Sequence, residues 1–208
     1  EAKGEKLLKE MTLEEKMGHR TQNTSTAIAD GLEITPAGDS IIRTYKVGSI
    51  LNVPDGHAQT PELYNKLVGE INRISIEEMG IPTLYGLDHI HGTSYVLGGV
   101  LFPQEINLAA SFNRQDAYNM GMVTAYESRA ADVPWTFSPT MDLGRNPSWS
   151  RMWESFGEDV YVNAEMAKAI TRGMQGNDPN HIGPHNIAAC AKHFMGYGVP
   201  VTGSDRTP

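Results

Sequence analysis

The chain has 208 residues and carries 17 Lys and Arg against 25 Asp and Glu, a formal net charge of −8 at pH 7. This acidic balance, without a Lys/Arg cluster, argues against nucleic acid and anionic membrane as partners. No apolar run approaches the roughly 20 residues that span a bilayer, and the single cysteine, Cys190, excludes an internal disulfide. The length suits one domain with a proper core.

The first 46 residues are predicted to form a leading helix and a loop. Leu7, Leu8, Met11 and Leu13 alternate with charges between Glu5 and Met17, and Thr12 and Glu15 have the spacing of a capping box. Residues 21–44 are rich in Thr, Ser, Gly and Asp, a composition typical of a loop.

Residues 47–208 alternate between short apolar strands and longer helices. Helices are predicted after Thr60, after Asn113 and after Ser155, which forms a second capping box with Glu158. The strands are predicted at 47–53, 82–87, 134–138 and 187–194. This alternation indicates an α/β fold with a parallel sheet and outer helices.

Four strands do not close a (β/α)8 barrel, which needs eight. We therefore expect the N-terminal part of such a barrel domain over residues 1–208, with the remainder of the barrel absent from this chain. A doubly wound open sheet is the alternative, but no glycine-rich phosphate turn follows the first predicted strand.

Polar residues gather where the predicted strands end. Asp88 follows one strand, Arg151 and Glu154 lie in the loop after the next, and Lys192 and His193 close the last. In a parallel barrel these positions converge at the active-site face. Carboxylates, Lys and Arg can hold sugar hydroxyls, and a Trp face can pack on a pyranose ring, so the set predicts a sugar site.

Local explanations remain open for several of these residues. Asp88 could cap a turn, and Arg151 with Glu154 could be a surface pair. Trp149 and Trp153 could be ordinary core or lid aromatics. A lysine after an apolar strand, by contrast, would be buried without a partner unless an anionic or hydroxylated group receives it.

Four segments resemble glycoside hydrolase family 3, the β-glucosidase family. They occur in the family's order and together span more than half of the chain. They are IPTLYGLDHIHG (Ile81–Gly92), FPQEINLAASF (Phe102–Phe112), SPTMDLGRNPSWSRMWESFGED (Ser138–Asp159) and CAKHFMGYG (Cys190–Gly198).

The resemblance implies a retaining exo-glycosidase that removes terminal β-D-glucosyl residues, with no cofactor and no metal. The substrate would be a β-glucoside or β-glucan oligosaccharide. Substrate-binding roles are implied for the sugar-contacting set, while Glu154 would orient Arg151 without touching the sugar. That set is Asp88, Arg151, Lys192, His193 and Arg206.

The resemblance places the nucleophile and the acid/base beyond Pro208, in the missing C-terminal part of the same protein. Composition alone would nominate Asp88 and Glu154 as the catalytic pair; the resemblance makes them binders. The family's N-acetylglucosaminidase branch has a His-rich loop after its Lys-His motif, and no His follows His193 here. An acidic chain that opens on Glu1 without Met favours a periplasmic or extracellular enzyme.

Two other readings remain. The His89-Ile90-His91 spacing could place two imidazoles on the metal of a metal-dependent barrel hydrolase. That pair normally ends the first barrel strand, whereas a strand is already predicted at 47–53. Alternatively, residues 1–208 alone could be an inactive sugar-binding fragment.

Overall fold

The computed structural model describes residues 2–206. Its centre is a five-stranded parallel sheet in the order β1-β4-β5-β6-β7, formed by Gln22–Thr24, Ser49–Leu51, Leu84–Leu87, Trp135–Thr136 and Ala188–Ala189. A small antiparallel hairpin is formed by β2 (Ala29–Asp30) and β3 (Glu33–Ile34). The α-helices are α1 Ala2–Glu10, α2 Leu13–His19, α3 Ser25–Ile28, α4 Pro36–Arg43, α5 Pro61–Met79, α6 Glu105–Ala109, α7 Arg114–Ala130 and α8 Val160–Gln175, and two short 3-10 helices are η1 Pro54–Gly56 and η2 Met152–Glu154.

The strands of the main sheet follow one another in chain order. β4 pairs with β5 through Ile50 and Tyr85, β5 with β6 through Gly86 and Trp135, and β6 with β7. The strand order never reverses, whereas a doubly wound sheet reverses at its switch point. The architecture is therefore an α/β fold with successive parallel strands and helices between them, as predicted for a barrel.

The prediction of a loop over residues 21–44 was wrong. This segment contains β1, α3, the β2–β3 hairpin and α4, so the sheet has five strands where four were predicted. β1 is polar and three residues long, and it is defined by its pairing with Ser49–Leu51. α4 has Thr35 as N-cap, accepting from the Gly38 N–H at 3.0 Å.

The capping residues were predicted with mixed success. Thr12 and Glu15 do form a capping box, which begins α2 and divides the predicted leading helix into two. Thr60 and Asn113 cap α5 and α7 as expected. The predicted box at Ser155 was wrong, because Asp159 caps α8 by accepting from Val162 N–H.

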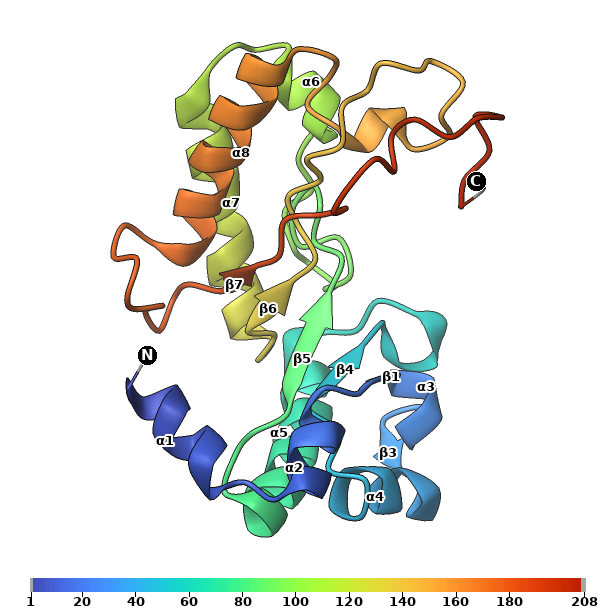
Figure 1. The fold of residues 1–208 in the computed structure, drawn as a ribbon, viewed down its shortest axis with the longest axis vertical. Helices are drawn as coiled ribbons and strands as arrows, with labels where there is room; N and C mark the ends of the chain where they lie inside the picture. Colours follow the sequence, from blue (N-terminus) through green and yellow to red (C-terminus); the bar gives the residue numbers. More distant parts are fainter. Residues whose placement is uncertain (1, 207–208) are drawn as a thin grey trace.

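The apolar core has two parts, one on each side of the central strand β5. Figure 1 shows α4 and α5 in the lower part, near β1 and β4, and α7 beside α8 in the upper part. A Cβ at Gly121 of α7 would lie 2.3 Å from the Ile170 carbonyl oxygen of α8, so this glycine is what lets the two helices approach closely. Among the described helices, none is long and apolar enough to cross a membrane.

Candidate functional site

The predicted site residues surround one open cavity of about 530 Å³ at the carboxyl ends of the sheet strands. Asp88 follows β5 directly, and the segment after β6 contributes Arg151 and Glu154. Lys192 and His193 follow β7 after a short extension, and Arg206 lies further along the chain. Parallel strands end at a common edge, which is why residues far apart in sequence line one cavity.

Lys192 and Asp88 form an ion pair. The Lys192 Nζ donates to Asp88 Oδ1 at 2.6 Å, and the side chains are 13% and 35% exposed, respectively. The backbone of Lys192 is fixed as well, because its N–H donates to the Pro139 carbonyl and its own carbonyl accepts from Met141 N–H. Lys192 therefore finds the anionic partner that its position after an apolar strand requires.

Arg151 donates two parallel hydrogen bonds to Glu154. Arg151 Nε lies 2.7 Å from Glu154 Oε1, and Nη2 lies 2.5 Å from Oε2. The Glu154 side chain is 6% exposed. Glu154 is the last residue of η2, and Arg151 directly precedes this short helix. The hydrogen bonds that Arg151 donates to Glu154 raise the pKa of the arginine, so the guanidinium stays charged and is held in one plane.

His193 is oriented by Asp142, a buried residue of the segment after β6. Asp142 Oδ2 accepts from both the backbone N–H and the Nδ1 of His193, at 3.0 and 2.7 Å. A carboxylate only accepts, so Nδ1 carries the proton and Nε2 is free to accept. The Nη1 of Arg151 lies 3.5 Å from that Nε2.

Tyr197 joins the two groups from the C-terminal segment. Its hydroxyl accepts from Arg151 Nη1 at 3.2 Å and donates to Asp205, and its ring lies 4.3 Å from the His193 ring between centroids. Buried Trp149 packs edge-on against the Tyr197 ring. Figure 1 shows this last segment running beside the loop that carries Arg151.

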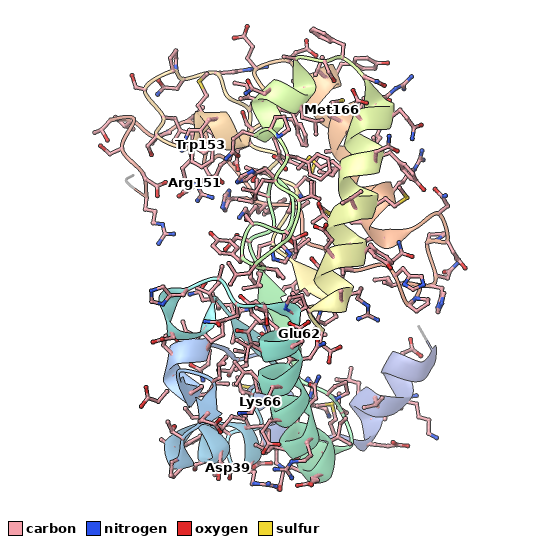
Figure 2. The ribbon with its side chains drawn as sticks, turned by 180° about the vertical axis from the view of Figure 1, so that it is seen from behind. Asp39, Glu62, Lys66, Arg151, Trp153 and Met166 are labelled. Carbon is pink, nitrogen blue, oxygen red and sulfur yellow. The ribbon has the colours of Figure 1, made fainter. Side chains whose placement is uncertain are left out.

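The two tryptophans considered from sequence have different environments. Trp149 is 2% exposed and packs in the interior, whereas Trp153 is 46% exposed and lines the cavity. The Trp153 indole N–H donates to the Ser150 carbonyl at 2.9 Å, which limits rotation of the ring. Figure 2 shows Trp153 beside Arg151 on the same side of the molecule.

Arg206 is held less firmly than the other members of the set. Its side chain is 80% exposed, and its Nε lies 3.5 Å from Asp205. It lines the cavity at the rim, so it can approach a bound molecule only from the solvent side.

The two imidazoles of the His-x-His motif have separate protein partners. His89 is fully buried, with Nδ1 2.6 Å from Ser128 Oγ, and burial lowers its pKa to about 3. His91 Nδ1 lies 2.9 Å from the Phe102 carbonyl oxygen. Within residues 2–206, no group of three or more His, Cys, Asp or Glu side chains is arranged to hold a metal ion.

The sequence-based prediction gives no role to three residues around the cavity. Asp142 and Tyr197 contact the set directly, and Glu105 is buried beneath it. Asp142 and Tyr197 each lie in a polar segment after a predicted strand, but that position alone does not indicate what they contact. The contacts of Tyr197 depend on how the C-terminal segment folds back across the strand ends.

The assembled groups can bind and orient a polyhydroxylated ring. Carboxylate oxygens of Asp88 accept hydrogen bonds, while Lys192 and Arg151 donate them, and the Trp153 ring offers an apolar face. Asp88 and Glu154 are each paired with a cation within hydrogen-bonding distance.

Residues 12–207 match the family model for the "Glycosyl hydrolase family 3 N terminal domain". Among characterised relatives, the lysosomal beta glucosidase of Dictyostelium discoideum is 38% identical over 97% of this chain. The periplasmic beta-glucosidase of Salmonella typhimurium is 29% identical over 96% of it. The crystal structure of an exo-1,3/1,4-beta-glucanase from a Pseudoalteromonas species superimposes with a TM-score of 0.86 at 31% identity over 97% of the chain.

The chain spans only about a quarter of each of these proteins. It covers 26% of the Dictyostelium enzyme, 24% of the Salmonella enzyme and 25% of the Pseudoalteromonas chain. The match therefore concerns one part of enzymes that are about four times longer.

Proposed function

Because the chain belongs to glycosyl hydrolase family 3, we propose that the complete protein hydrolyses terminal non-reducing β-D-glucosyl residues. Residues 1–208 form the N-terminal part of its barrel domain and supply most of the pocket for the terminal sugar. Family membership also argues against the metal-dependent hydrolase alternative. The observation that carries the proposal is the convergence of Asp88, Lys192, Arg151 and His193 on one cavity.

Each of these groups has a distinct task in the proposed pocket. Asp88 accepts hydrogen bonds from sugar hydroxyls, and Lys192 donates to them from beyond the end of β7, two strands away in the sheet. Arg151 and His193 bind the same ring, with Glu154 and Asp142 fixing their orientation. Arg206 approaches the ring from the solvent side.

Trp153 is proposed to contact the sugar unit or aglycone at the cavity rim. Its indole is half exposed, tethered at one edge, and close to Arg151. An aromatic face can cover the apolar C–H surface of a pyranose, which makes this side chain suited to a β-glucan oligosaccharide.

The bond-breaking groups are proposed to lie outside residues 1–208. A retaining mechanism needs a nucleophile and an acid/base about 5 Å apart. The cavity carboxylates Asp88 and Glu154 are already engaged with cations. The greater length of the relatives supports a source elsewhere in the protein. The relatives named as periplasmic and lysosomal support export from the cytoplasm.

The proposal is tested by assaying the purified complete protein on 4-nitrophenyl glycosides. We expect the highest kcat/KM with the β-D-glucoside, and lower values with the β-D-xyloside and the N-acetyl-β-D-glucosaminide. NMR of the first-formed product should show the β-anomer, as retention requires. Turnover of the xyloside or the amino sugar alone would contradict the glucoside assignment, and an α-anomeric product would contradict retention.

A further inference from the structure

Glu105 is a fully buried carboxyl group directly behind the sugar pocket. It is the first residue of α6 and follows Gln104, which lines the cavity. Its oxygens accept from the Thr140 N–H at 3.2 and 3.4 Å, and Ser138 Oγ donates to it at 3.5 Å. None of the salt bridges found within residues 2–206 includes it.

Burial disfavours the ionised form of this carboxyl group. Burial raises the pKa of Glu105 well above its usual value, and the negative charge of Glu154 adds to that effect. The Thr140 N–H, the Lys192 ammonium and the Ser138 hydroxyl act in the opposite direction without being ion-pair partners. An isolated buried carboxylate would be far more costly than the neutral acid.

Glu105 is connected to Lys192 through the segment that it holds. Thr140 and Ser138, its partners, belong to the extension of β6. The same extension fixes the chain around Lys192, since Cys190 N–H donates to the Ser138 carbonyl and Lys192 N–H to the Pro139 carbonyl. Glu105, from the segment after β5, thus contacts the extension of β6, and that extension in turn pairs with the strand end bearing Lys192.

We propose that Glu105 is a positioning residue that sets the backbone of Ser138–Thr140 and through it the place of Lys192 in the sugar pocket. This inference rests on the proposed function. It assigns no contact between Glu105 and the sugar. The requirement is for a buried group that accepts from the Thr140 N–H.

The test compares Glu105→Gln with Glu105→Ala in the complete protein. The Gln amide is neutral and its oxygen can accept from Thr140, so kcat/KM on 4-nitrophenyl β-D-glucoside should stay within about 3-fold of the wild type. The Ala variant lacks that acceptor, and displacement of Lys192 should lower kcat/KM roughly 10- to 100-fold. Since Lys192 is proposed to bind the sugar ring, the inhibition constant for glucose should be higher in Glu105→Ala than in the wild type.

A matched core variant separates positioning from loss of stability. Ile170 is fully buried in α8, away from the cavity-lining set. Ile170→Ala should lower the melting temperature but leave kcat/KM unchanged at a temperature where every variant is folded. Equal losses of kcat/KM in Ile170→Ala and Glu105→Ala would overturn the inference.

The pH dependence of the melting temperature tests the raised pKa of Glu105. A folded-state pKa above the unfolded value stabilises the fold at low pH, and this contribution is lost as pH rises from about 4.5 through the folded pKa. The melting temperature of Glu105→Gln should therefore decline less than that of the wild type over this range. Parallel declines would show that the folded protein does not raise the pKa of Glu105, and a Glu105→Gln variant as impaired as Glu105→Ala would overturn the positioning role. An inactive wild type would instead refute the proposed function itself.

Discussion

The ammonium nitrogen of Lys192 lies 2.6 Å from Oδ1 of Asp88, although 104 residues separate the two in the chain. Both side chains line the same cavity and both remain partly exposed. A sugar hydroxyl that enters between them can donate to the carboxylate while it accepts from the ammonium. Closure of the site over the ring would remove water and strengthen both interactions.

The bidentate pair between Arg151 and Glu154 predicts that Glu154→Gln impairs the enzyme. The amide presents an N–H₂ group where Arg151 needs an acceptor, so the guanidinium loses its fixed plane. We expect kcat/KM to fall about 10- to 100-fold, measured on 4-nitrophenyl β-D-glucoside. Glu165→Gln is the matched control, because Glu165 pairs with Arg114 and Lys168 on the exposed side of α8. Equal activity in the two variants would rule out this role for Glu154.

We expect Trp153 to affect the binding of oligosaccharides more than the rate of bond cleavage. Trp153→Ala is expected to raise KM for laminaribiose or cellobiose by roughly 5- to 50-fold through loss of the aromatic face, with a smaller change in kcat. Trp153→Phe retains a ring and should restore most of the affinity. If Trp153→Ala keeps the wild-type KM for both disaccharides, the rim contact is refuted.

Buried His89 predicts a specific dependence of stability on pH. Its folded pKa of about 3 lies below the ordinary value of 6.5, so the unfolded chain takes up the proton first as pH falls. The stabilisation is present above pH 6.5 and is lost between about 6.5 and 3, by at most about 1.4 kcal/mol per pH unit. The melting temperature of His89→Asn should therefore fall less steeply over this range than that of the wild type. Identical slopes would show that His89 does not titrate on unfolding.

The strand ends and their polar residues were predictable because their signals are local. An apolar run followed by Asp88, or by Lys192 and His193, marks the carboxyl end of a buried strand in any parallel sheet. Helix α5 was equally predictable, because Thr60 and Pro61 mark its start and apolar residues at helical spacing follow them.

Two of the missed features depend on contacts between distant segments, and one depends on a local turn. β1 has no apolar pattern, and its pairing with β4 alone makes it a strand. Asp159 is preferred over Ser155 as N-cap because the Ser155 hydroxyl donates to the Met152 carbonyl and accepts from Gly157 N–H within the preceding turn. Tyr197 meets Arg151 only because the C-terminal segment returns across the strand ends. Neither the pairing of β1 with β4 nor the contact of Tyr197 with Arg151 has a signature in the local sequence.

The most direct test of the sugar pocket is kcat/KM of Asp88→Asn in the complete protein on 4-nitrophenyl β-D-glucoside. Asp39→Asn is the control, because Asp39 pairs with Arg43 on the surface at the far end of the molecule from Arg151 (Figure 2). Hydroxyl contacts tighten in the transition state, so Asp88→Asn should lose about 2 to 4 kcal/mol, roughly 30- to 1000-fold, while Asp39→Asn stays at the wild-type value. An unchanged kcat/KM in Asp88→Asn would contradict the account.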